Sequence, residues 1–168
     1  MKKLFLIFLL VILSMASAKA QSLVVFIHDG DGPYSNVRNA PNGKIVDRIP
    51  TDQNAMLDVY DPVNGWWEIA DGSYYVPDGG MPRLTPAKKH YIHSSCIAVS
   101  TRNYGGQRLS LRKTPSAKGA AVYSFSQEIL LRPLDITNGW VKVKTLDGKH
   151  TGWIQDEWLC GNSVTNCN

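Results

Sequence analysis

The sequence predicts an all-β protein, and three observations lead to this fold class. Short runs rich in Val, Ile, Leu, Tyr and Trp recur after residue 20, and clusters of Gly, Pro, Asn and Asp separate them. Apolar residues do not repeat at helical spacing for more than about one turn. Several motifs also occur twice, in the same order. We therefore expect two small β units in tandem.

The start of the chain has the pattern of an export signal. Two lysines precede the apolar run Leu4–Ile12, and Ala18 and Ala20 are small residues at the expected cleavage site. The apolar run is too short to cross a membrane, and no stop-transfer segment follows it. We expect a signal peptide at residues 1–20 and an exported mature chain from Gln21, in the periplasm or outside the cell, without a transmembrane anchor.

The charge of the mature chain gives no support for a nucleic-acid partner. The formal net charge of +4 falls to +1 when Lys2, Lys3 and Lys19 leave with the signal peptide. Proteins that bind nucleic acid through phosphate contacts need a concentrated basic face. We therefore expect no nucleic-acid partner.

Three cysteines remain in a compartment that permits disulfides. Cys160 and Cys167 flank the turn-rich spacer GNSVTN, which can fold back and close a terminal loop. We favour a disulfide between these two residues. Cys96 is the alternative partner for either of them, and is otherwise a free thiol or pairs outside the chain.

The expected strands follow one another with short turns between them. The first, SLVVFI, ends at the turn cluster HDGDGPY, and AMLDVYD then alternates apolar and polar residues. The turns PVNG, TNG and DGK join later strands into hairpins. The expected strands lie at 22–27 (SLVVFI), 55–61 (AMLDVYD), 66–70 (WWEIA), 128–136 (EILLRPLDI), 140–146 (WVKVKTL) and 151–155 (TGWIQ).

The internal repeat is the clearest signal in the chain. NVRNAP at residues 36–41 is followed by SLRKTP at residues 110–115, 74 residues later. Gly65-Trp66 is followed by Gly139-Trp140 at the same offset. The repeat therefore extends over most of each unit.

The closing segments of the two copies have a different offset. YIHSSCI, which starts at Tyr91, resembles WIQDEWL, which starts at Trp153, 62 residues later. The first copy therefore carries an insertion of 12 residues, near residues 70–88. The boundary between the copies falls near residues 97–100, with almost no linker.

These ordered motifs resemble the bacterial Src-homology-3 domain (SH3b). The resemblance rests on the NVR-x-x-P turn, the Gly-Trp strand and the closing Gly-Trp-Ile strand, and it covers the mature chain twice. It implies two small SH3-like β-barrels packed in tandem, at residues 21–97 with the insertion and at residues 98–168 with a C-terminal tail. The first copy departs from the pattern at Tyr91, which replaces Trp.

The resemblance also implies a function. We expect an exported, non-enzymatic binding protein that recognises cell-wall peptide (peptidoglycan) or another envelope component through the two units, each weak and the pair linked for avidity. The alternative is a protein–protein scaffold or a secreted inhibitor that acts through the enlarged loop of the first unit.

The candidate ligand-binding residues are aromatic. Strand alternation places Trp67, Ile69, Val141 and Val143 on the core face, and leaves Trp66 and Trp140 at least partly exposed. Alternatively, each of these two Trp residues packs under a loop or between the units. Tyr74 and Tyr75 lie in the insertion, which either forms a recognition surface or is a hairpin extension that covers an edge strand or contacts the second copy. The candidates are Trp66, Tyr74, Tyr75, Tyr104, Trp140 and Trp153.

The Val-Arg and Leu-Arg turns have mainly an architectural interpretation. We expect Val37 and Leu111 to enter the core, while Arg38 and Arg112 bond to nearby carbonyls or lie over an aromatic ring. Direct contact between either arginine and a ligand is the alternative.

Catalytic and metal-binding patterns are absent from the sequence. His90, His93 and Cys96 recur at steps of three on an expected strand, so they cannot all face one metal ion. HDGDG at residues 28–32 has too few oxygen ligands for a calcium loop. Cys96 lacks the separate His scaffold that a cysteine peptidase requires. We expect no enzyme activity, no cofactor and no metal.

Overall fold

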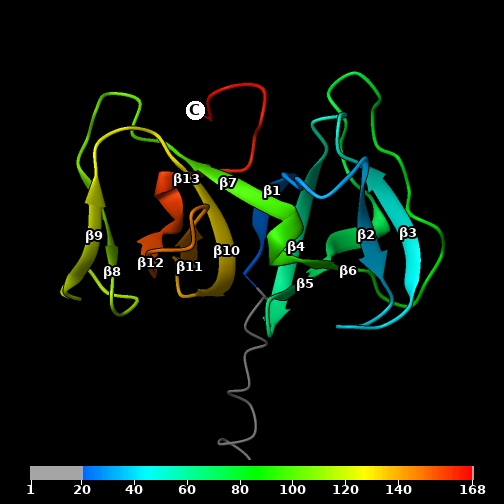
Figure 1. Ribbon diagram of the computed structural model, residues 1–168, viewed down its shortest axis with the longest axis horizontal. Helices are drawn as coiled ribbons and strands as arrows, with labels where there is room; N and C mark the ends of the chain where they lie inside the picture. The colour runs from blue at the N-terminus through cyan, green and yellow to red at the C-terminus, as the bar shows by residue number, and fades with distance from the viewer. Residues whose placement is uncertain (1–20, 168) are drawn as a thin grey trace, which may run out of the picture.

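The computed structural model describes residues 21–167, and it consists of β-strands joined by turns and loops (Figure 1). The predicted signal peptide lies outside the described residues. The expected all-β class is confirmed. Within the described range, helical structure is limited to the single-turn 3-10 helices η1 (Ala70–Gly72), η2 (Ser94–Cys96) and η3 (Asp156–Trp158). In this part of the chain no helix has the length and apolar character needed to cross a membrane.

The strands fall into two sets, which we name the first half (residues 21–97) and the second half (residues 98–167). The first half contains β1 (Leu23–Ile27), β2 (Tyr34–Arg38), β3 (Ile45–Pro50), β4 (Met56–Val63), β5 (Trp66–Ile69) and β6 (Tyr91–His93). The second half contains β7 (Ile97–Thr101, which starts at the boundary), β8 (Leu109–Arg112), β9 (Ala121–Phe125), β10 (Leu130–Thr137), β11 (Trp140–Thr145), β12 (Thr151–Gln155) and β13 (Leu159–Cys160).

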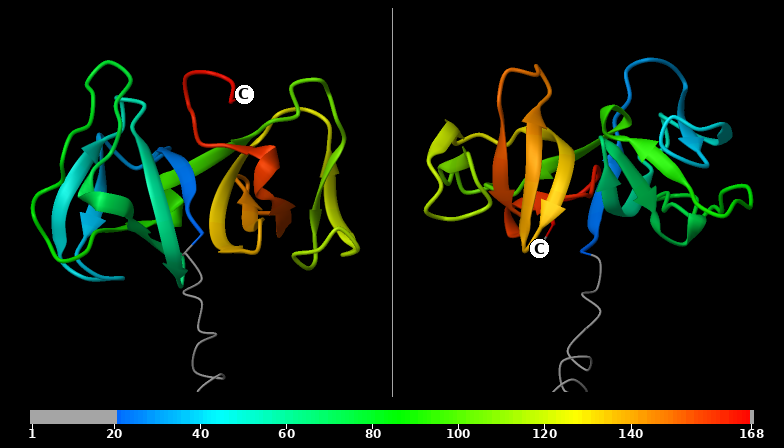
Figure 2. Two further views of the ribbon diagram at one scale, coloured as in Figure 1. Left: turned by 180° about the vertical axis from the view of Figure 1, so that it is seen from behind. Right: turned by 90° about the horizontal axis from the view of Figure 1, so that it is seen from below.

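Both halves have the same strand order. Counted outward from the middle of the path, the first half runs β1-β4-β5-β6-β2-β3 and the second half runs β7-β10-β11-β12-β8-β9. Each strand of the first half therefore has a counterpart at the same place in the second half. The halves lie side by side, with β1 and β7 adjacent between them (Figures 1 and 2). The path is open, and its ends are β3 and β9.

Strand β7 belongs to both halves. Its first residues pair with β1, in the register Ile27↔Ile97 and Phe26↔Ala98. Its later residues pair with β10 on one side and with β13 on the other. The pairing of Ile97 with β1 corresponds to that of Leu159 with β7, because each follows a 3-10 helix after the closing strand of its half. One strand thus ends the first half and begins the second.

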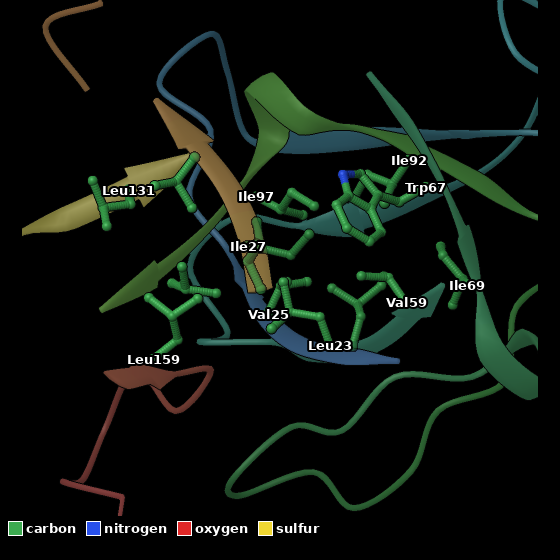
Figure 3. Close-up of a cluster of buried hydrophobic side chains, with 14 of the residues drawn as sticks. Leu23, Val25, Ile27, Val59, Trp67, Ile69, Ile92, Ile97, Leu131 and Leu159 are labelled. Carbon is green, nitrogen blue, oxygen red and sulfur yellow. The ribbon is translucent and has the colours of Figure 1, made fainter. Parts of the chain in front are cut away.

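The core follows the expected strand alternation. Trp67 and Ile69 on β5 and Val141 and Val143 on β11 are buried, which confirms their assignment to the core face. The indole Nε1 of Trp67 donates a hydrogen bond of 3.1 Å to the carbonyl of Pro133 on β10. The cluster combines side chains from both halves (Figure 3); those drawn include Leu23, Val25, Ile27, Val59, Ile92, Ile97, Leu131 and Leu159.

Polar contacts also join the halves. The guanidinium of Arg132 on β10 donates to the carbonyl of Ile97 at 2.8 Å and to the carbonyl of His28. Cys160 and Cys167 form a disulfide that closes the C-terminal loop, and Cys96 is the free cysteine of residues 21–167. Ser163 in this loop donates to the carbonyl of Asn54 at 3.4 Å, so the loop reaches back to the first half.

Candidate functional site

In both halves the arginine of the repeated turn donates a hydrogen bond to the carbonyl of a glycine a few residues later. Arg38 Nη1 donates to the carbonyl of Gly43 at 2.6 Å, and Arg112 Nη1 donates to the carbonyl of Gly119 at 2.8 Å. The neighbouring Val37 and Leu111 are fully buried. These contacts match the architectural interpretation, in which each arginine bonds to a nearby carbonyl and the apolar residue before it enters the core.

An Asn-Gly turn places a tryptophan at the start of the following strand in each half. Asn64 and Gly65 have φ of 51° and 81°, and Asn138 and Gly139 have φ of 48° and 78°. Hairpin turns with positive φ at both central residues favour Asn-Gly, because Gly has no Cβ and Asn tolerates this conformation. Trp66 and Trp140 therefore occupy equivalent positions.

In the second half, two tryptophans and two basic residues share the outer side of the sheet. We name Arg112, Trp140, Lys142 and Trp153 the outer face. Trp153 on β12 is opposite Lys142 on β11 and opposite Arg112 on β8. Trp140 is opposite Gln155, so the two indoles are diagonal neighbours, about 7–8 Å apart at the backbone. All four side chains are half-buried. The outer face therefore combines two partly exposed indoles with two cationic groups.

The equivalent surface of the first half is covered, which corrects the expectation for Trp66. Trp66 is only 8 % exposed, although it lies on the side of β5 opposite the core face. The Arg38 guanidinium lies over the indole, with Cζ 5.7 Å from the ring centroid. The His93 ring packs against the indole with a centroid distance of 4.9 Å. Because cover comes from β2 and β6, Trp66 does not form an exposed platform.

A buried carboxylate takes the place of Lys142 in the first half. Glu68 is 6 % exposed and accepts hydrogen bonds from Lys89 Nζ at 2.6 Å, Tyr60 OH at 2.8 Å and Tyr91 OH at 3.2 Å. Burial raises the pKa of Glu68, but the hydrogen bonds from Lys89 and Tyr60 outweigh it and hold the pKa below its usual value. The hydrogen bond to Glu68, together with burial, raises the pKa of Tyr60 to about 12. The carboxylate is therefore ionised, and its oxygens already accept hydrogen bonds from residues of the first half.

The insertion lies against the first half and contains a half-buried and an exposed tyrosine. Tyr75 exchanges two backbone hydrogen bonds of 2.8 Å with Met56 on β4. Farther along, the Thr85 amide donates to the Asp47 carboxylate on β3. Tyr74 packs against the core, whereas Tyr75 is 42 % exposed. The insertion thus covers part of the first half and also presents an aromatic ring to solvent.

The six aromatic candidates do not form one site. Trp140 and Trp153 share the outer face of the second half, and Tyr74 and Tyr75 lie on the insertion. The exposed Tyr104 lies elsewhere, because its hydroxyl accepts a hydrogen bond of 3.0 Å from the Cys167 amide of the C-terminal loop. Lys142 was missed as a site residue, although its position two residues after Trp140 places it on the same face.

The free thiol is not activated. Burial, followed by a hydrogen bond to the negatively charged Asp29, raises the pKa of Cys96 to about 11. A thiol nucleophile needs a lowered pKa, which a neighbouring cation or helix N-terminus provides. Within residues 21–167, no three His, Cys, Asp or Glu side chains are grouped closely enough to hold a metal ion.

Comparison with known proteins identifies one segment of the chain. Residues 107–159 match the family model of the bacterial SH3 domain. The matched segment runs from β8 to the start of β13 and contains the whole outer face. The expected resemblance is thereby confirmed for this segment, whereas a second SH3 unit stays a prediction. No curated protein matches the chain.

Two solved structures show a weak overall likeness. The structure of NlpC1 from Trichomonas vaginalis is 12 % identical, with 89 % of this chain and 49 % of that chain covered and a TM-score of 0.34. NlpC2 from the same organism is 10 % identical, with coverage of 90 % and 53 % and a TM-score of 0.32. The chain spans about half the length of these proteins, and the TM-scores are too low to establish a common fold.

Proposed function

We propose that this chain is an exported, non-enzymatic binding protein made of two SH3-like barrels packed in tandem. Its ligand is cell-wall peptide or another peptide-containing envelope component, which binds at the outer face of the second half. One observation carries the proposal. The segment that matches the bacterial SH3 domain presents Trp140 and Trp153 as partly exposed diagonal neighbours, beside two cationic side chains.

The strand order supports a tandem of related units. Every strand of the first half has a counterpart in the second, both Arg turns include a hydrogen bond to a glycine carbonyl, and the two Asn-Gly turns have nearly equal φ angles. The first unit differs because Arg38, His93 and Lys89 cover the surface that is open in the second. Ligand recognition is therefore assigned to the second unit.

The chemistry of the outer face suits a peptide that carries carboxylates. Two indoles offer a large apolar area with little loss of side-chain entropy on binding. Lys142 lies two residues after Trp140 and opposite Trp153, and Arg112 is opposite Trp153 on its other side, so an acidic group of the peptide meets a cation next to an aromatic ring. A shallow face of this kind binds weakly, and attachment to an insoluble polymer compensates through avidity.

Two features support a non-enzymatic role. The single free thiol of residues 21–167 has a raised pKa, which keeps it protonated at neutral pH. Arg112, which lies within the outer face, has a donor engaged by the carbonyl of Gly119. The free thiol therefore does not supply an activated nucleophile, and the Arg112 side chain is held in place by its turn.

Co-sedimentation with purified peptidoglycan tests the proposal. We expect mature protein, residues 21–168, to pellet with the polymer, and Trp153→Ala to bind at least about tenfold more weakly. Tyr75→Ala is the matched control, because Tyr75 is an exposed aromatic residue of the first half whose pairing with Met56 uses only backbone atoms. Failure of the unmodified protein to pellet contradicts the proposal, as does equal binding by Trp153→Ala.

The exposed part of the insertion favours a second candidate function. Tyr75 is 42 % exposed and Met81 is 62 % exposed, so the insertion offers apolar area to a protein partner. In this case the chain acts as an envelope scaffold or a secreted inhibitor. Capture of an envelope protein that is lost in Tyr75→Ala and retained in Trp153→Ala supports this second function over the first.

A further inference from the structure

The first half buries a carboxylate at a place where the fold does not require one. Glu68 on β5 is 6 % exposed, and strand alternation places its side chain on the side opposite the core face. At the repeat offset, Lys142 takes the place of Glu68 and Leu134 takes the place of Tyr60. The second half thus builds the same strand order without this carboxylate. Because burial of a charge is unfavourable unless its partners offset the cost, Glu68 needs an explanation beyond the fold.

Two phenols and one ammonium group surround this carboxylate. Tyr60 on β4 and Tyr91 on β6 are the cross-strand neighbours of Glu68. Their hydroxyls donate to the carboxylate at 2.8 Å and 3.2 Å, and Lys89 Nζ donates at 2.6 Å. Both tyrosines belong to the sheet, whereas Lys89 lies in a loop. The carboxylate and the two phenols therefore form a fixed receptor for an ammonium group, and Lys89 occupies it.

The loop that carries Lys89 is anchored at its two ends. His90 Nε2 donates to the carbonyl of Thr85 at 2.9 Å, which joins the ends to each other. Thr85 is also bonded to β3, and His90 is also bonded to β5. Between these anchors, no backbone–backbone hydrogen bond within residues 21–167 involves residues 86–89. The Lys89 side chain is 48 % exposed, so it can leave Glu68 without breaking a strand or the core.

A cleft of about 340 Å³ lies beside the buried carboxylate. Glu68 and the whole loop segment 86–89 line it. Arg83 and Lys88 also line it and are exposed, as is the second acidic residue of the cleft, Asp71. The cleft therefore combines a buried anion with exposed cations. A ligand that has both an ammonium group and a carboxylate matches this charge distribution, whereas a simple cation or anion matches only half of it.

From these contacts we propose that the cleft binds a short peptide that carries a primary ammonium group and a carboxylate. The ammonium replaces Lys89 Nζ on Glu68, and the carboxylate pairs with Arg83 or Lys88. Because the buried carboxylate exchanges one cation for another, it is never left unpaired. The displaced lysine returns to water, where its side chain regains rotamer freedom. The site lies in the first half and does not rest on the outer face of the second half.

Two small probes test whether the ammonium comes from an amino terminus or from a side chain. Alanylalanine supplies the first and Nα-acetyl-lysine supplies the second, and each also has a carboxylate. Each probe is titrated into ¹⁵N-labelled mature protein with its disulfide intact. We expect saturable NMR shifts at the amides of Glu68, Ile69 and Tyr91 with at least one probe.

Two blocked forms of alanylalanine separate the contributions of its ends. N-acetylalanylalanine lacks the ammonium group, and we expect it to give no saturable shifts. Alanylalanine amide lacks the carboxylate, and we expect it to bind at least about threefold more weakly than alanylalanine. If only Nα-acetyl-lysine binds, lysine amide and Nα,Nε-diacetyl-lysine take the place of these two controls.

Substitutions in the receptor test the location. Lys89→Met removes the internal competitor, and we expect the probe to bind about tenfold more tightly, because more of the protein is then competent to bind. Lys118→Met is the matched control, since Lys118 is an exposed lysine of the second half that does not line the cleft. Glu68→Gln removes the anion, and we expect the saturable shifts to disappear. The amide spectra without probe show whether each variant is folded, and the blocked probes keep the test decisive on the unmodified protein.

Four results would overturn the proposal. The first is the absence of saturable shifts with both probes, and the second is equal binding by the probe that lacks its ammonium group. The third is binding to folded Lys89→Met that is no tighter, which makes Lys89 only a structural clamp. The fourth is a set of shifts at Lys142 and Trp153 in place of Glu68. That result places the peptide on the outer face, so it supports the proposed function while it rejects the site in the first half.

Discussion

The guanidinium of Arg38 lies over the indole of Trp66, with Cζ 5.7 Å from the ring centroid. The same guanidinium donates to the carbonyl of Gly43, so one side chain fixes a turn and covers a tryptophan. Arg112 makes the equivalent turn contact in the second half. The arginine of the repeated motif therefore fixes a turn in both halves, and in the first half it also covers the surface that the second half leaves open.

We expect Arg38→Ala to destabilise the protein more than Arg112→Ala. Loss of a hydrogen bond from a charged group costs about 1.5–3 kcal/mol, and loss of the cation–π contact adds about 0.5–1 kcal/mol. Urea denaturation of both variants measures the two free energies of unfolding. Equal losses for the two variants would show that the contact with Trp66 contributes nothing. Arg38→Lys should not restore stability, because an ammonium lacks the planar guanidinium geometry.

Glu68 makes stability depend on pH in the acid range. The pKa of Glu68 is lowered in the folded state, because the hydrogen bonds from Lys89 and Tyr60 outweigh the effect of burial. Its contribution is present above the unfolded-state pKa of about 4.3 and is lost as pH falls through the folded-state value. We expect Glu68→Gln to be less stable than the unmodified protein at pH 7, with a difference that shrinks below about pH 4.

The pH test of Glu68 uses urea denaturation of both proteins at several pH values. Asp47 on β3 also has a lowered pKa, through hydrogen bonds from Thr85 and Arg48 that outweigh burial, so both proteins lose some stability in acid. The difference between them isolates Glu68. A stability difference that stays constant from neutral pH to about pH 3 contradicts the assignment.

Cys96 should resist alkylation in the folded protein. Its pKa is about 11, against about 8.5 for an ordinary thiol, so the thiolate fraction at neutral pH is lower by roughly two orders of magnitude. We expect iodoacetamide to react about 100-fold more slowly in native buffer than in urea, as followed by intact mass. Cys96→Ser shows whether the added mass is on this residue. Rapid modification in native buffer would revive the nucleophilic role that we reject.

Gly161 is expected to tolerate no side chain. A Cβ at this position would overlap the backbone carbonyl and the side chain of Val24 on β1. Because the carbonyl belongs to a paired strand, Gly161→Ala should cost about 1–3 kcal/mol of stability. Gly30→Ala is the control, since a Cβ there meets no atom within 4 Å, and a change below about 0.5 kcal/mol is expected. Thermal unfolding measures both, and an equal effect of the two substitutions refutes the close packing of the C-terminal loop on β1.

Much of the fold could be predicted because it depends on local patterns. Strand alternation is a property of neighbouring residues, and it assigned Trp67 and Val141 to the core face. The prediction that Trp66 is partly exposed was wrong, because Arg38 and His93 cover it and both lie on strands distant in sequence. The same alternation rule treats Trp66 and Trp140 identically, although only Trp140 remains half-exposed.

The path of the insertion and the junction depend on tertiary relationships that strand patterns do not contain. The repeat offset indicated an insertion near residues 70–88, but it did not indicate that the insertion would pair with Met56 and add Val76 and Leu84 to the core. Likewise, the short boundary near residues 97–100 suggested two units without a linker. It did not indicate that a strand would be common to both.

The shared strand has a consequence for how this chain unfolds and how it could evolve. Because β7 pairs with β1, β10 and β13, a cut at the boundary would remove a partner from strands on either side of it. Fluctuations that open one half therefore reach the other, and the whole chain is expected to melt in a single cooperative transition. We therefore expect that neither half keeps its fold when it is moved into another protein without the other.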